Sequence, residues 1–322
     1  MNIAIISSTK DKASVNIKEN LINNFGFNKI KEEFDNNNIF QYNFDNKIIK
    51  LHTLDSDLID AENIDNRVSA DLFVFISRHS AKEERKCLTA HAPGNFGKNE
   101  MGGKEKTLCV APAFCLKKII RELNKNAENS DYEVSMEVTH HGPFLEKPVL
   151  FVEIGSAEKE WLDSNAGNII AKSLISTIKN NSMVNNNLIN KNYNGSIDKN
   201  SNGKNKSKIT INHGNSMETK NNEKSSNEIT NNNYESVFVI GGSHYNHVAN
   251  KVMLKTDFAV GHICAKYNLE NSDIELIKQA MEKTVPKAKF VLLDWKGLGK
   301  EKQRILEMLE RNGIEYKRSD KI

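Results

Sequence analysis

Short, nearly continuous apolar runs recur along the chain and are separated by longer segments of mixed polarity. Runs of this kind are typical of strands that are buried on both faces of a sheet. They predict strands at residues 2–7, 71–77, 106–112, 149–155, 236–242, 257–263 and 289–295. A further strand is predicted at 132–138, where apolar and polar residues alternate.

The segments between these runs carry apolar residues at helical spacing. They predict helices at 14–24, 113–127, from Ser156 to about 179, at 271–284 and at 300–313. Ser156 is a candidate N-cap of its helix, and Gly313 a candidate stop signal. Strands that alternate with helices predict an α/β fold, a three-layer α/β/α sandwich around a mixed, mostly parallel sheet.

The pattern stops between residues 180 and 233, where Asn, Lys and Ser dominate and apolar periodicity is lost. A segment of this composition buries too little apolar surface to offset the entropy cost of ordering it. We therefore expect a disordered low-complexity insertion at 180–233. It would interrupt a single α/β/α domain formed by residues 1–179 and 234–322.

Composition narrows the class of protein only slightly. Charged residues make up 27% of the 322 residues, hydrophobic residues 38%, and the net charge is +3. This balance permits contact with nucleic acid without requiring it. The four cysteines form no C-x-x-C pair, which favours buried thiols in a reducing compartment. The apolar start of the chain is too short for a signal peptide, and no run is long enough to span a membrane. We expect a cytoplasmic protein.

Two adjacent histidines in the stretch VTHHGP, His140 and His141, close the alternating strand. Gly142 and Pro143 follow and end the strand. A histidine pair is as often structural as functional. Because neighbouring side chains on a strand diverge, we expect the two rings to do different jobs if they are functional.

Six of the nine histidines follow a predicted strand or lie in a glycine-rich turn: His79, His91, His140, His141, His244 and His262. Loops that follow strands of such a sheet gather at one edge. Imidazole is a preferred ligand of Zn²⁺, and a catalytic zinc takes three protein ligands. The histidines therefore indicate a zinc site at that edge.

Two carboxylates join this set. Glu153 interrupts the apolar run FVEIG, and Glu137 lies just before the histidine pair. A glutamate in a buried strand is costly unless it is paired or bound to a metal, although Glu137 could equally face solvent. Each could be a ligand, an orienting partner of a histidine, or a general base. By residue type we assign His79, His91, Glu153 and His244 to metal, and His140, His141 and Glu137 to catalysis. The pattern predicts a metal-dependent hydrolase.

Several segments in a fixed order are more specific than any single one. SRHSAKEERKCLTAHAPGNF, EVTHHGPF, FVEIGSAEKEW, GGSHY and GHICAKY together resemble the archaeal and plant type of D-aminoacyl-tRNA deacylase. The resemblance covers nearly the whole chain outside 180–233. It departs from the family at HHGP and GGSHYNH, where the family more often has HHTP and GGGHYAP, but the histidines are kept.

The resemblance implies a phosphorylase/hydrolase-like fold and a zinc-dependent hydrolase that acts as a monomer. Its substrate would be the ester between a D-amino acid and the 3′ end of tRNA, and its products the free D-amino acid and tRNA. One or two zinc ions would activate water and polarise the ester. Candidate contacts to the acceptor end are Arg78, Lys82, Arg85, Lys86 and His262.

Three other functions stay open at this point. A zinc peptidase or amidohydrolase would use the same ligands. A nucleoside phosphorylase would need a phosphate site in place of zinc, and a non-catalytic tRNA-binding protein would bind tRNA without hydrolysing it. The basic segment SRHSAKEERK weakly favours a substrate that carries phosphate.

Overall fold

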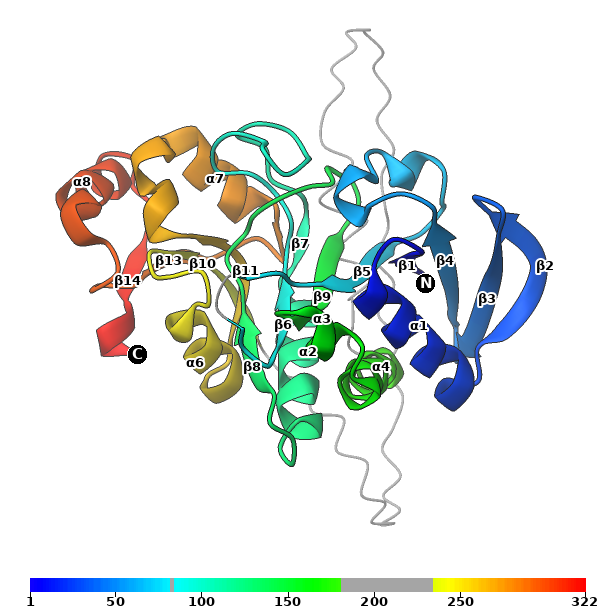
Figure 1. Ribbon diagram of the computed structural model, residues 1–322. Coiled ribbons are helices and arrows are strands. Elements are labelled where there is room, and N and C mark those ends of the chain that lie inside the picture. Colours follow the sequence, from blue (N-terminus) through cyan, green and yellow to red (C-terminus); the bar gives the residue numbers. More distant parts are fainter. Residues whose placement is uncertain (82–83, 181–233) are drawn as a thin grey trace, which may run out of the picture.

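The structure of the protein is a computed structural model that describes residues 1–81, 84–180 and 234–322 (Figure 1). The expected insertion at 180–233 lies outside the described residues, apart from Asn180. Lys82 also lies outside them.

An eight-stranded sheet forms the larger part of the fold, in the order β2-β3-β4-β1-β5-β9-β6-β8. Its strands are β1 (Asn2–Ser8), β2 (Asn28–Phe34), β3 (Asn37–Phe44), β4 (Lys47–Leu54), β5 (Leu72–Arg78), β6 (Cys87–His91), β8 (Glu133–Met136) and β9 (Val149–Gly155). The central strands β4, β1, β5 and β9 pair in parallel. Strand β6 pairs antiparallel to β9, whereas β8 pairs parallel to β6.

A second, four-stranded sheet is parallel throughout and has the order β11-β10-β13-β14. Its strands are β10 (Glu235–Ile240), β11 (Phe258–Cys264), β13 (Phe290–Leu293) and β14 (Tyr316–Arg318). The short strands β7 (Ala111–Pro112) and β12 (Thr284–Val285) form a third, parallel pair. The predicted mixed, mostly parallel α/β sheet is thereby confirmed, although it is divided into separate sheets.

Helices cover these sheets unequally (Figure 1). The α-helices are α1 (Lys12–Phe25), α2 (Ala113–Asn126), α3 (Glu158–Trp161), α4 (Ser164–Lys179), α6 (His247–Lys255), α7 (Ile274–Glu282) and α8 (Lys302–Arg311). One apolar core joins α1, α2, α4 and α6 to one face of both larger sheets. The other face of the four-stranded sheet packs on α7 and α8, which completes three layers there.

The other face of the eight-stranded sheet has a different cover. Its core contains Phe73, Phe75 and Phe151, and the residues packed on it come from the short 3₁₀ helices η1 (Leu58–Asp60) and η2 (Ile64–Asn66) and from loops. Loops can open a cavity over a sheet more readily than a packed helix can. The functional candidates lie over this face.

Several sequence predictions need correction. Residues 106–110 belong to no strand, and the predicted strand at 106–112 shrinks to β7. The helix from Ser156 divides into α3 and α4, with Asp163 as the N-cap of α4. Ser156 does not cap a helix, because its hydroxyl is bonded to the backbone of Arg85. No helix in the described part of the chain is long and apolar enough to cross a membrane.

Candidate active site

The site is built on Glu153, near the C-terminal end of β9. Glu153 is aligned with Ser77 of β5 on one side and with Thr89 of β6 on the other. Because β6 runs antiparallel to β9 and β5 runs parallel to it, the C-terminal ends of β5 and β6 point to opposite edges of the sheet. The expectation that the histidines gather at one edge is therefore wrong. Five of the six, all but His262, gather over the face of the sheet that carries Glu153.

Three imidazoles form the first cluster. His91, His140 and His141 offer ligand atoms that all lie within 4.8 Å of one another. Nδ1 of His91 lies 3.2 Å from the carbonyl of Ala92. Nδ1 of His140 lies 2.8 Å from the carbonyl of Val138, and Nδ1 of His141 lies 2.6 Å from that of Gly142. A carbonyl only accepts hydrogen bonds, so each Nδ1 carries the proton and each Nε2 keeps a free lone pair. This tautomer is the one that binds a metal through Nε2.

His140 and His141 converge, contrary to the expectation that adjacent side chains diverge. Their ring centroids are 4.4 Å apart, and each ring also lies within 5 Å of the His91 ring, at 4.5 and 4.8 Å. The reason is the backbone of His141, whose φ of 48° is left-handed and breaks the alternation of a strand. Gly142 follows, and a Cβ at this position would meet the backbone of Gly103 at 2.2 Å. The sequence Gly-Pro therefore permits a turn that brings both rings to one side.

A second cluster contains His79, Glu137 and His244, again with ligand atoms within 4.8 Å. Glu137 is completely buried. Its Oε2 lies 2.9 Å from Nε2 of His244, and its Oε1 lies 3.1 Å from Nδ1 of His79. Nε2 of His140 lies 3.6 Å from the same carboxylate, so Glu137 connects the second cluster to the first.

Glu153 connects the two clusters a second time. Its Oε1 accepts a hydrogen bond from Ser77 at 2.7 Å. Its Oε2 lies 3.6 Å from both Nδ1 of His79 and Nε2 of His91. His91, Glu137 and Glu153 form a third group that could hold an ion. The buried glutamate in an apolar strand is thus paired with histidines, as its cost requires.

Burial and the neighbouring charges decide the protonation of these groups. Burial, together with the adjacent imidazoles, lowers the pKa of His141 to about 4 and holds the pKa of His140 well below its usual range. Burial would also lower the pKa of His79, but contacts with the two glutamates outweigh it and raise this pKa to about 10. The same contacts hold the pKa values of Glu137 and Glu153 below the usual range in spite of burial.

A cavity of about 660 Å³ opens over these residues. Its wall includes His79, His140, His141, Glu153 and His244. The wall also includes four apolar side chains: Leu58, Ile59, Met101 and Phe151. A cavity with a few converging polar groups and apolar walls is the usual form of a small-molecule site. The arrangement can bind a cation, exclude water and orient an apolar group beside it.

Comparison with known proteins decides the family. A sequence profile described as D-aminoacyl-tRNA deacylase matches residues 66–317. A D-aminoacyl-tRNA deacylase of Thermococcus kodakarensis is 31% identical over 97% of this chain and 98% of that protein. The relative of the same name from Methanocaldococcus jannaschii is 31% identical over 99% of this chain and all of that protein.

The chain belongs to the D-aminoacyl-tRNA deacylase family. The resemblance seen in the sequence is confirmed. A crystal structure of a conserved protein of unknown function has a TM-score of 0.75 to this chain at 27% identity, and the match covers 100% of this chain and 96% of the other. The whole fold, both larger sheets included, is therefore shared with a solved structure.

Of the residues predicted to bind the substrate of a deacylase, Arg78 and Arg85 lie in different places. Arg78 lines the cavity over the histidines, where its guanidinium lies 3.7 Å from Asp57 and 5.6 Å from the Trp161 ring. Arg85 lies in a neighbouring pocket, where it is paired with Glu133. Lys86, also predicted, is paired with Asp131.

His262 lies within the predicted strand at 257–263 and does not join the other candidate residues at the cavity. It is completely buried in β11, with Nε2 3.0 Å from the carbonyl of Cys109 and Nδ1 3.1 Å from the hydroxyl of Thr139. Both ring nitrogens are thus occupied by protein groups. The imidazole lies behind the loop that carries His140 and His141, away from the cavity that a deacylase substrate would enter.

Sequence reasoning missed three polar residues of the site: Ser77, Thr139 and Tyr245. The Tyr245 hydroxyl lies 2.9 Å from Nε2 of His79. Ser77 donates a hydrogen bond to the predicted carboxylate Glu153, and Thr139 directly precedes His140 in the sequence. The only available signal was adjacency to a predicted ligand, as for Tyr245 next to His244 in GGSHY.

Proposed function

We propose that the chain is a metal-dependent hydrolase that cleaves the ester bond of D-aminoacyl-tRNA and releases the D-amino acid and tRNA. The family supports the reaction. The metal rests on one observation, the cluster of His91, His140 and His141 with each Nδ1 held by a backbone carbonyl. Such a cluster is costly without a ligand, because it buries three imidazole lone pairs against one another.

The donor atoms fit zinc. Nε2 of His91 is buried and has no hydrogen-bond partner among the described residues. Three imidazoles leave one position of a tetrahedral zinc open, as catalytic zinc sites do. Contacts with Glu153 raise the pKa of His91 in spite of burial, so zinc would displace a proton from this ring. The low pKa values of His140 and His141 keep both rings neutral near pH 7, which is the ligand form. Zinc, when bound, supplies a Lewis acid that polarises the ester carbonyl and makes water a better nucleophile near neutral pH.

A second ion would be held by His79, Glu137 and His244, the other cluster within ligand distance. This assignment differs from the one made from residue type. It moves His140, His141 and Glu137 from catalysis to the metal, and Glu153 from the metal to catalysis. The geometry favours the change, since these two rings and His91 face one another.

The carboxylates supply the proton chemistry. Glu153 is buried, ionised and 3.6 Å from both His79 and His91, so it can take a proton from a water in the cavity. Ser77 orients Glu153 by donating a hydrogen bond to Oε1. Glu153 can then return this proton to the departing ribose oxygen, because His79, as a ligand of the second ion, would give up its own proton when that ion binds.

The cavity walls supply binding. Leu58, Ile59 and Met101 give an apolar surface for the amino-acid side chain. Arg78, at the same cavity, can contact a phosphate of the acceptor end. All the clustered side chains come from one chain, so a monomer is sufficient, and the substrate requires a compartment that contains tRNA, such as the cytoplasm.

The test is hydrolysis by the purified protein of matched D- and L-tyrosyl-tRNA, with and without a chelator. We expect loss of the D ester only, no loss after chelation, and recovery when zinc is added. Cleavage of an aminoacyl amide in place of the ester would point to a peptidase. Binding of tRNA without hydrolysis of either ester would show that the chain is a non-catalytic tRNA-binding protein, and would overturn the proposal.

A further inference from the structure

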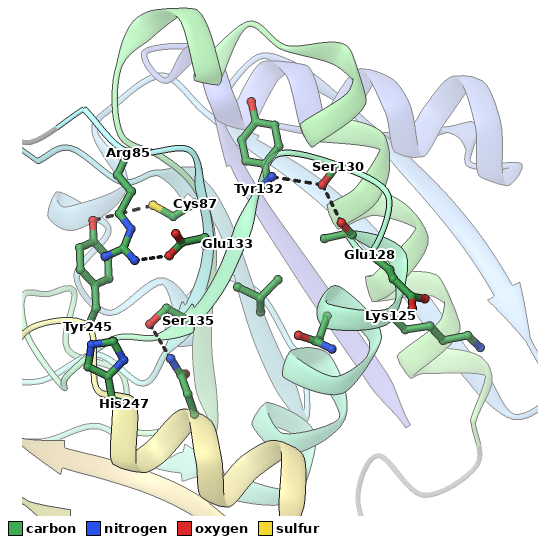
Figure 2. Close-up of a pocket in the computed structure, with 14 residues that line it drawn as sticks. Arg85, Cys87, Lys125, Glu128, Ser130, Tyr132, Glu133, Ser135, Tyr245 and His247 are labelled. Carbon is green, nitrogen blue, oxygen red and sulfur yellow. Dashed lines mark hydrogen bonds and ion pairs between the residues drawn. The ribbon is translucent and has the colours of Figure 1, made fainter.

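A second pocket, of about 710 Å³, lies beside the cavity over the histidines. Strand β8, the C-terminal end of α2 and the beginning of α6 form its walls (Figure 2). In Figure 2, Arg85, Tyr245 and His247 lie on one side of β8, and Lys125 and Glu128 on the other. Nothing in the proposed reaction uses this pocket.

Tyr245 is the wall between the two cavities, since it lines both. Its hydroxyl lies 2.9 Å from Nε2 of His79, within the site, and its ring lies 5.3 Å from the guanidinium of Arg85, within the second pocket. The two cavities therefore adjoin each other at Tyr245.

The lining of the pocket is polar and carries both signs of charge. The floor holds the buried Cys87, Tyr132 and Ser135. The rim holds two kinds of charged side chain, the cations Arg85 and Lys125 and the carboxylates Glu128 and Glu133. A simple anion would be repelled by the carboxylates, and an apolar ligand would cover the charged side chains of the rim without pairing them. The ligand therefore needs a negative group together with hydrogen-bond donors.

We propose that this pocket binds the single-stranded nucleotide that precedes the terminal adenosine of tRNA. Such a nucleotide carries a phosphate for Arg85 or Lys125. Its base can stack on the ring of Tyr245 or on the guanidinium of Arg85. The base before the terminal adenosine is cytosine, whose amino group is a donor that a glutamate accepts. This inference rests on the proposed function, because it extends the same substrate from the ester into the neighbouring pocket.

The experiment measures the binding to the zinc-loaded protein of a fluorescent CCA trinucleotide that carries no amino acid. The kinetics of hydrolysis are measured separately. The test variant is Arg85→Ala/Lys125→Ala. The control is Arg311→Ala/Lys172→Ala, which removes the same charges from α8 and α4; like Arg85, Arg311 is paired with a glutamate. We expect the trinucleotide to bind about tenfold more weakly to the test variant, and equally to the control and the parent.

Kinetics should show the same division. The test variant should raise KM for D-tyrosyl-tRNA and leave its hydrolysis of D-tyrosyl-adenosine, which lacks the preceding nucleotide, at the parent rate. Equal trinucleotide binding by all three proteins, or no binding to the parent, would overturn the pocket assignment. If the parent binds the trinucleotide but cleaves neither ester, the proposed function fails and the pocket assignment stands.

Discussion

The hydroxyl of Thr139 lies 3.1 Å from Nδ1 of His262. Thr139 directly precedes the His140–His141 pair in the sequence. The same hydroxyl oxygen accepts a hydrogen bond from the backbone N–H of Ile263 at 3.1 Å. His262 is in turn held by the carbonyl of Cys109. The buried imidazole and Thr139 thus fix the start of the histidine loop to β11. We regard both as positioning residues, because neither faces the cavity.

Thr139→Val should weaken zinc binding by about tenfold, the low end of the cost of losing a direct partner of a metal ligand. Thr139 contacts no proposed ligand through its hydroxyl and acts through the backbone that leads into His140. The replacement keeps the shape of the side chain and removes only the hydroxyl. Thr177→Val is the matched control, since Thr177 is also buried and its hydroxyl donates to a backbone carbonyl in α4. Both variants should lose about 1 kcal/mol of stability. Equal zinc affinity of the two variants, titrated against a competing chelator, would show that Thr139 positions nothing.

His140→Ala and His141→Ala should both lose zinc. The two rings face His91 together, so removing either one breaks the same site. We expect each to weaken zinc affinity by more than the roughly 10–100-fold cost of losing an outer partner. The control is His52→Leu, because His52 is buried in β4 and is absent from the candidate metal clusters. Zinc content per folded chain is the measurement. If one of the two alanine variants keeps its full zinc content, the histidine replaced in it is not a ligand and is assigned to catalysis again.

The fully buried strands could be predicted from the sequence, and the hairpins could not. β1, β5 and β9 are nearly continuous apolar runs, and each lies within one residue of its predicted position. By contrast, β2 and β3 are mostly exposed or half-buried, so many of their residues are polar and show no run of buried apolar positions. The missed signal was the pair Asp35–Asn36, whose positive φ values of 50° and 59° make the tight turn between them.

Most of the residues that the candidate site brings together were selected from the sequence, apart from Ser77, Thr139 and Tyr245, but their grouping could not be predicted. Residue type was sufficient to select the histidines and the two glutamates, because such residues are rare in apolar runs. The grouping depends on two facts that no local pattern carries: the antiparallel direction of β6 and the left-handed backbone at His141. His91 also ends a strand that the sequence analysis did not predict.

His244→Ala should separate the two proposed ions. It removes a ligand of the second cluster and leaves His91, His140 and His141 intact. We expect two zinc ions per parent chain and one per variant chain by elemental analysis. The first ion should still stabilise the variant, by about 2.7 kcal/mol at a free zinc concentration one hundred times Kd. A parent chain with a single zinc that His244→Ala does not remove would eliminate the second site.

The pH dependence of stability should contain a contribution from His52. Burial lowers the pKa of His52 to about 4, and its Nδ1 has no hydrogen-bond partner among the described residues. The unfolded chain therefore takes up this proton first as pH falls. The contribution of His52 to the free energy of unfolding is therefore complete above about pH 6.5 and is lost as pH falls towards 4. His52→Leu should flatten the fall in unfolding free energy between pH 7 and pH 5, measured with urea. Identical pH profiles would mean that His52 does not resist protonation in the folded state.

Lys117 should be one of the most important single side chains for stability. Its side chain extends from α2 into the protein, and its ammonium donates to the carbonyls of Met253, Thr256 and Phe258 at 2.8, 2.8 and 2.7 Å. These carbonyls lie at and just beyond the C-terminal end of α6, where a positive charge is favourable. Lys117→Met would leave the carbonyls buried without this donor, so we expect a loss of about 3 kcal/mol.

Its neighbour Lys118 is the matched control, because it lies on the same helix and Lys118→Met removes the same charge. Nζ of Lys118 is buried and has no hydrogen-bond partner among the described residues. Burial without a partner lowers its pKa to about 8, so its replacement by an apolar side chain should leave stability unchanged or raise it. Burial lowers the pKa of Lys117 to about 7, so urea denaturation of both variants at pH 6, where both lysines of the parent are protonated, measures the difference. Equal destabilisation by the two substitutions would show that the carbonyl contacts of Lys117 contribute nothing beyond its charge.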